Sequence, residues 1–108
     1  TYNRNGDAAM RIIQKYVDAI DEELEGAKEY AEKYVEYRVK EDSSTANRYK
    51  EMANDELKHA MYEHEWAVKE VGELSKIYNP PVEMQEKWDK AHKEYVEKVA
   101  WIKQMLAM

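Results

Sequence analysis

The feature that most constrains this fold is a long stripe of apolar residues with helical spacing. Between residues 13 and 37 the stripe recurs every three or four positions, as one face of an α-helix in a bundle does. Its members are Ile13, Tyr16, Ile20, Glu23, Ala27, Tyr30, Tyr34 and Tyr37. Glu23 is the only charged member. The stripe therefore predicts a long amphipathic helix with one carboxylate in the middle of its packed face.

Two breaks interrupt this helical pattern. The segment EDSST at residues 41–45 clusters residues that cap helices. The segment NPP at residues 79–81 stops one helix and starts another, with Asn79 as the cap. Near the start of the chain a turn precedes the first helix, and Asp7 is placed to cap it.

These breaks predict an all-α fold of three helices in a single domain, residues 1–108. The expected helices span residues 7–40, 45–78 and 82–107, each end being uncertain by about two to four residues. Because both connections are short, consecutive helices should lie antiparallel to each other. The expected arrangement is a long helical hairpin with a third helix beside it.

Composition narrows the classes of function. Charged residues make up 37% of the chain, with 3 Gly and 2 Pro, as expected for long helices. The net charge is −6 and no basic cluster is present, which argues against a nucleic-acid partner. The chain has no Cys, which excludes disulfides and thiolate metal sites. No apolar run approaches the roughly 18 residues of a membrane span. We expect a cytoplasmic protein.

Midway along the second expected helix the apolar stripe turns polar. The stripe reads Tyr49, Met52, Glu56, His59, Glu63 and Trp66. Burying an ionised carboxylate without a partner costs several kcal/mol, so such groups are paired, protonated or bound to metal. Glu56 and His59 stand three positions apart and share a helix face. A carboxylate with an imidazole suits Fe, Mn or Zn better than Ca or Mg.

The expected register brings Glu23 to the same level. In an antiparallel hairpin, residues at one level have a constant index sum. A turn centred near residue 41 places Glu23 level with His59, and a centre near 43 places it level with Glu63. Both centres lie in the EDSST segment. Glu23, Glu56 and His59 are therefore our expected metal ligands.

The third helix should not complete this site. A turn centred near Pro80 places His92 level with Val68, about 13 Å along the axis from His59. A two-metal site of this kind takes about four carboxylates and two His, which is twice the set in one chain. Twofold pairing would supply the second set. We expect a homodimer or higher homo-oligomer whose two hairpins form a four-helix bundle around the metals.

Two segments resemble the ferritin-like superfamily, specifically rubrerythrin-like and encapsulated-ferritin-like proteins. EELEGAKEYAEKY at residues 22–34 is similar to the family's first-helix motif, which maps a ligand onto Glu23 and a Tyr onto Tyr30. ANDELKHAMYEHE at residues 53–65 is similar to its Glu-x-x-His motif, which maps onto Glu56 and His59. The resemblance covers roughly the first 78 residues. Unlike four-helix members, this chain lacks a second Glu-x-x-His.

The resemblance implies two Fe ions shared between two chains, with Mn or Zn as alternatives, and ferroxidase or peroxide chemistry. The shortened half-site form resembles encapsulated ferritins, which assemble their metal site between chains. It also resembles short ferritin-like proteins of phage and gut-bacterial genomes. A location inside a protein shell or virion is therefore an alternative to free cytoplasm. The alternative function is a ferritin-like structural or assembly protein without catalytic metal.

Several residues keep more than one interpretation. Glu23 could pair with a Lys or His, and Glu56 with His59 could form an ordinary ion pair. Glu63 could be a ligand, but we favour a group that orients His59 or a surface residue. Tyr30 is expected in the core, or as a hydrogen-bond partner of a ligand. His64 and His92 are expected as edge or core histidines, and the Tyr and Trp residues as core. A helical dimer with no ligand would be favoured if the polar segment were exposed.

Overall fold

The computed structural model describes residues 4–77 and 82–108. It contains three α-helices: α1 (Arg4–Val39), α2 (Ser43–Ile77) and α3 (Val82–Leu106). No strand occurs within these residues. The predicted all-α class with three helices is confirmed over this part of the chain. None of the described helices is long and apolar enough to cross a membrane.

The helix boundaries differ slightly from those predicted. Helix α1 begins at Arg4, so Asp7 lies inside its first turn, where a negative charge still favours the helix dipole. Helix α2 begins at Ser43 because Asp42 caps it, and the Asp42 carboxylate accepts a 3.1 Å hydrogen bond from the Thr45 backbone N–H. The hydrogen bonds from Thr45 lower the pKa of Asp42. The predicted cap Asn79 lies outside the described residues.

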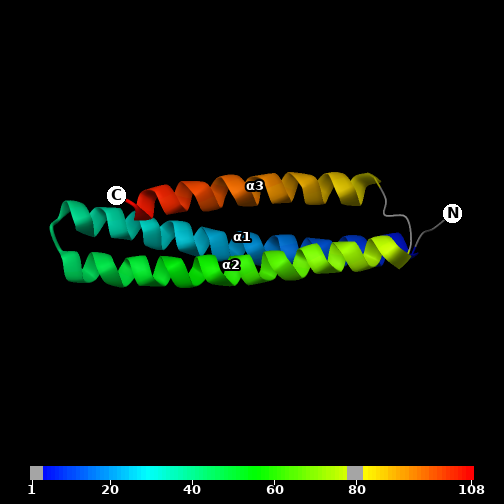
Figure 1. Cartoon of the computed structure of the whole chain (residues 1–108), viewed down its shortest axis with the longest axis horizontal. Coiled ribbons are helices and arrows are strands. Elements are labelled where there is room, and N and C mark those ends of the chain that lie inside the picture. The colour runs from blue at the N-terminus through cyan, green and yellow to red at the C-terminus, as the bar shows by residue number, and fades with distance from the viewer. Residues whose placement is uncertain (1–3, 78–81) are drawn as a thin grey trace.

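The three helices lie side by side along one long axis, and the molecule measures 62 × 18 × 17 Å (Figure 1). Helices α1 and α2 are antiparallel and connected at one end, while α3 runs in the same direction as α1. The backbone of α3 lies closer to α1 than to α2. An ion pair of 3.6 Å between Lys98 and Asp21 joins α3 to α1, as does a 2.9 Å hydrogen bond that Arg38 donates to the Met108 carbonyl.

Alanines form the packed seam of the α1–α2 hairpin. Seven alanines of these helices are fully buried: Ala9, Ala27, Ala31, Ala46, Ala53, Ala60 and Ala67. Small side chains let two helix backbones approach closely and leave little room for sideways adjustment. No charged or polar residue is buried among the described side chains. The alanine seam thus fixes the distance across which side chains of α1 and α2 can meet.

The prediction that all Trp residues belong to the core is wrong for two of them. Trp88 of α3 is 8% exposed, but Trp66 of α2 and Trp101 of α3 are 58% and 57% exposed. The apolar stripe that contains Trp66 faces away from α3. No residue in the described part of α3 lines the hollow beside Trp66, and the indole meets solvent.

Enlarging a seam residue should force the hairpin apart. We expect Ala60→Leu to lower the free energy of unfolding by about 1–3 kcal/mol, because the added atoms have no free volume at a fully buried position. Urea unfolding followed by circular dichroism measures this. The matched control, Lys69→Leu at an exposed position of the same helix, should change stability by no more than about 0.5 kcal/mol. Equal effects of the two variants would contradict a tight seam.

Candidate metal centre

The structure brings Glu23, Glu56 and His59 together. Each offers one ligand atom, and these atoms all lie within 4.8 Å of one another. Nδ1 of His59 lies 3.5 Å from a carboxylate oxygen of Glu23 and 4.0 Å from one of Glu56. Among the side chains that the structure describes, this is the one group of three or more His and acidic residues close enough to hold a metal ion.

Local geometry explains why these three side chains meet. Helix α1 ends at Val39 and α2 begins at Ser43, so the turn is centred at residue 41 and places Glu23 level with His59. Glu56 and His59 are three positions apart on α2, which aligns them on one face. Both helices lead into the turn without interruption. The register predicted from a turn centre of 41 is therefore the one observed.

Gly26 makes room for the Glu56 carboxylate. A Cβ atom at position 26 would lie 3.2 Å from an oxygen of Glu56, which is tighter than an ordinary contact. Sequence reasoning missed this residue. The available signal was a glycine inside a long helix, three positions after Glu23, where it lowers helix propensity by about 1 kcal/mol relative to Ala. Gly26 lets the carboxylate of α2 lie directly against the backbone of α1.

Glu23 perturbs the ionisation of Glu56. The pKa of Glu56 is raised, first by a hydrogen bond with Glu23, then by partial burial and by the negative charge of Glu23. The nearby His59 acts in the opposite direction. Two carboxylates that face each other favour one shared proton or a cation between them. In this cluster, a cation and a proton would compete for the same carboxylate oxygens of Glu23 and Glu56.

The cluster lies at the surface of the single chain, not in its interior. The side chains of Glu23 and Glu56 are 25% and 27% exposed, and that of His59 is 55% exposed. We had expected this segment inside a bundle. It is half-open because α3 packs on the other side of the hairpin, so one chain covers only part of the three side chains.

The uncovered side of the hairpin is here called the open face. Two hollows on it, lined by α1 and α2 alone, flank the cluster. The residues that line these two hollows include Ile12, Tyr16, Ala19, Tyr30, Tyr49, Glu63 and Trp66. No described residue of α3 lines either hollow. Aromatic and aliphatic groups thus flank the acidic cluster along the hairpin.

Glu63 lies on the open face beside this cluster but outside it. One of its carboxylate oxygens is buried and has no hydrogen-bond partner within the described part of the chain. Burial raises the pKa of Glu63, and the charges of Glu22 and Glu56 add to the effect while His59 opposes it. No hydrogen bond or ion pair joins Glu63 to His59 within the described residues, and Glu63 is not part of the ligand group, so the geometry gives it no ligand role in a single chain.

Tyr30 lies against another aromatic residue. Its ring centroid is 6.2 Å from that of Tyr49, which in turn stacks on Tyr37 at 5.7 Å. Of the two interpretations given to Tyr30, the packing role agrees with these contacts. The three rings form an aromatic group between α1 and α2, on the turn side of the cluster.

His64 and His92 lie together between α2 and α3, apart from the cluster. Their ring nitrogens are 2.8 Å apart. The predicted level of His92, opposite Val68, is wrong by four residues, or about one helical turn. The error arises because a symmetric turn at Pro80 was assumed, whereas α3 is shifted along α2. The conclusion that α3 offers no ligand to the cluster agrees with the side chains described.

The donor set fits a divalent transition-metal ion. Ligand atoms bound at about 2.1 Å to one ion lie about 3.0 Å apart when adjacent and about 4.2 Å when opposite. The observed separations, up to 4.8 Å, reach that range with small rotations of the exposed side chains. Two carboxylates with one imidazole are the donors that Fe, Mn and Zn accept. Three protein ligands leave coordination positions open.

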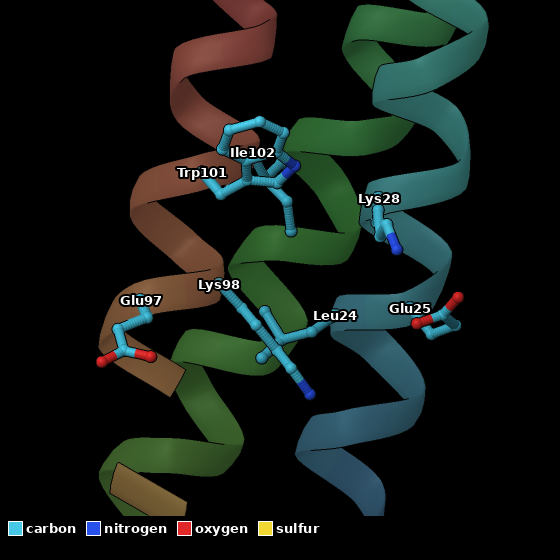
Figure 2. Close-up of a pocket in the computed structure, with 7 residues that line it drawn as sticks. All are labelled: Leu24, Glu25, Lys28, Glu97, Lys98, Trp101 and Ile102. Atoms are coloured by element: carbon cyan, nitrogen blue, oxygen red, sulfur yellow. The ribbon is translucent and has the colours of Figure 1, made fainter. Parts of the chain in front are cut away.

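A further hollow lies between α1 and α3 and is less suited to a specific ligand. This groove has a volume of about 240 Å³, with Leu24, Trp101 and Ile102 forming its apolar part (Figure 2). Two Glu and two Lys surround them, and Lys98 is already paired with Asp21. Mixed charges around a small apolar surface select neither an anion nor a cation. The groove also contains no His.

Comparison with known proteins gives no relative from which a function could be transferred. No family model matches the chain, and no curated protein or solved structure was found to be similar to it. The geometry of the Glu23, Glu56 and His59 cluster is therefore the feature that indicates a function.

In the metal-free protein, repulsion between the carboxylates of Glu23 and Glu56 should lower the free energy of unfolding by an amount that depends on pH. The pKa of Glu56 in the folded state is above its ordinary value of 4.5. The stabilising contribution of the Glu56 side chain is therefore fully present below about pH 4.5. That contribution is lost as the pH rises through the folded-state pKa. With chelator present, we expect Glu56→Gln to stabilise the protein by about 0.5 kcal/mol at pH 7 and to change nothing near pH 3.5.

Urea unfolding at the two pH values measures this difference. Glu51→Gln, an exposed position on the same helix, is the control and should be neutral at both. If Glu56→Gln lowered the stability of the metal-free protein at neutral pH, the two carboxylates would not be repelling each other.

Proposed function

We propose that this chain binds iron through Glu23, Glu56 and His59, at a two-metal site completed by a second copy of itself. The observation that carries the proposal is the convergence of these three side chains from two helices on the open face. Manganese and zinc are alternative metals with the same donor preference. The proposed assembly is a homodimer, alone or within a larger homo-oligomer.

The open face supports pairing with an identical hairpin. One chain supplies two carboxylates and one imidazole, and a twofold axis beside the cluster would double this to four and two, the usual two-metal set. Tyr62 and Trp66 nearby are 48% and 58% exposed. Exposed aromatic residues around a partly covered polar group are typical of protein interfaces. Pairing would cover both the aromatic groups and the cluster.

Each residue of the site has a distinct role in the proposal. Glu23 and Glu56 chelate or bridge the ions, and His59 binds one ion from α2. Gly26 lets the Glu56 carboxylate approach α1, and the alanine seam holds the two helices at a fixed separation. When bound, iron supplies the redox chemistry toward oxygen or peroxide. The chain itself orients the carboxylates and restricts access of water once the open face is covered.

The proposed class is a ferritin-like iron protein of the short, half-site form, with ferroxidase or peroxide-reducing activity. The resemblance of residues 22–34 and 53–65 to that superfamily supports this class. The proposed location is the cytoplasm, and the resemblance adds the interior of a protein shell or virion as an alternative. If the hairpins associate in the same way without metal, the protein is instead a structural or assembly module.

Removal of any one ligand should abolish both metal binding and metal-linked pairing. We expect untagged wild-type protein, loaded with Fe(II) without oxygen, to retain about one iron per chain and to sediment as a dimer or larger. We expect a loss of iron affinity of at least tenfold in each of Glu23→Ala, Glu56→Ala and His59→Ala. Even the loss of a residue that only orients a metal ligand lowers metal affinity by about 10–100-fold. Elemental mass spectrometry and sedimentation velocity provide the two readouts.

Glu25→Ala and Glu51→Ala serve as matched controls, because each removes one exposed carboxylate from α1 or α2 outside the cluster. Both should bind iron as the wild type does. A wild-type chain that remained monomeric at high micromolar concentration with iron present would contradict the proposal. Metal-independent dimers that all three ligand variants also form would indicate the structural alternative.

A further inference from the structure

A second polar contact lies between α2 and α3, where His64 and His92 meet. Nε2 of His64 is 2.8 Å from Nδ1 of His92, a hydrogen-bond distance. One imidazole must donate and the other accept, so at least one ring must be neutral. This contact therefore exists only at a pH where the pair carries at most one charge.

Aromatic rings enclose His64. Its ring stacks on Tyr95 at 4.1 Å between centroids and 8° between planes, and Trp88 lies 5.6 Å away. Trp88 is only 8% exposed. The stacking removes water from the imidazole. Burial is accordingly the main cause that lowers the pKa of His64, with the charge of His92 second.

The His pair is the polar link between α2 and α3. Among the hydrogen bonds and ion pairs of the described residues, it is the one that joins these two helices. Helix α3 is otherwise bound to α1, through Lys98 with Asp21 and through Arg38 with the Met108 carbonyl. The backbones of α2 and α3 lie farther apart than those of α1 and α3. Loss of the pair would therefore weaken one edge of α3 while the other edge stays attached.

A metal ion explains the pair less well than a hydrogen bond. Two nitrogens bound to one tetrahedral zinc at 2.0–2.1 Å would lie about 3.3 Å apart, not 2.8 Å. Within the described side chains, no third His or acidic residue joins His64 and His92 to form a ligand group. The geometry is that of two imidazoles joined by a hydrogen bond, which carry at most one charge between them.

We propose that the His64–His92 pair is a pH-sensitive latch, which holds α3 against α2 at neutral pH and releases it on mild acidification. Protonation of both rings leaves neither able to accept a hydrogen bond and places two like charges in contact. The rings of Tyr95 and Trp88 cover part of His64, whereas His92 is exposed to solvent. The edge of α3 that faces α2 then separates, while its contacts with α1 remain.

The sign of the pH effect follows from the direction of the shift. Because the folded-state pKa of His64 is below its ordinary value of 6.5, the contribution of the pair is complete above that pH. It is lost as the pH falls through the lowered pKa. The groups that act on His64 are His92 from α3 and Glu65 from its own helix, and Glu65 opposes the shift. No group of α1 contributes, and burial keeps Tyr95 neutral by raising its pKa.

Spin labels test the latch directly. The chain has no Cys, so Val68→Cys on α2 and Val96→Cys on α3, which are 49% and 52% exposed, allow specific labelling. Without metal, we expect pulsed electron paramagnetic resonance to give a narrow distance distribution near pH 7.5. Near pH 5, the distribution should broaden toward longer distances, because a pair that gains a second proton has no nitrogen left to accept the hydrogen bond. A distribution unchanged between these pH values would overturn the proposal.

Two controls assign any change to this pair. His64→Leu with His92→Leu replaces the titrating rings by apolar groups but retains His59, and it should make the α2–α3 distance independent of pH. Equal opening of this double variant would also overturn the proposal. If it does not fold, His92→Gln provides an uncharged partner, which should at least halve the broadening. Labels on α1 and α2 at Glu32→Cys and Glu51→Cys should report a constant distance, since the latch does not involve the hairpin.

Discussion

The close approach of α1 and α2 across an alanine seam is the constraint on which the rest of the structure depends. Fully buried alanines at positions such as Ala27 and Ala60 allow the two backbones to pack tightly. A turn centred at residue 41 then fixes which side chains stand level. Glu23 and His59 meet at 3.5 Å because of this register, and Glu56 joins them because Gly26 leaves space.

The position of α3 divides the hairpin into two sides with different chemistry. On one side, α3 covers apolar residues and contributes His92, which meets His64 beside the ring of Tyr95. On the other side, the cluster of Glu23, Glu56 and His59 remains partly exposed between two hollows that α1 and α2 form. The first contact is satisfied within one chain. The cluster supplies only half of the ligands that the proposed two-metal site needs. The proposed metal chemistry therefore requires assembly with a second copy.

Features that depend on local periodicity could be predicted from the sequence, whereas features that depend on long-range packing could not. Apolar spacing of three and four residues predicted the helices, and index sums placed Glu23 level with either His59 or Glu63, of which the structure has the first. Periodicity could not indicate which apolar stripe α3 covers, so Trp66 was wrongly expected in the core. A symmetric turn placed His92 one helical turn from its observed level, because the shift of α3 depends on long-range packing. Gly26 carries no donor atom, so a search for ligands passes over it.

The most direct test of the central claim is anomalous X-ray scattering at the iron absorption edge, on crystals of the full chain soaked in Fe(II). The account predicts anomalous peaks between two copies of the chain, each peak within bonding distance of Glu23, Glu56 or His59 from both copies. The same crystals without iron should show no such peaks. Iron bound by one chain alone, or no peak at these residues in a fully soaked crystal, would contradict the shared two-metal site.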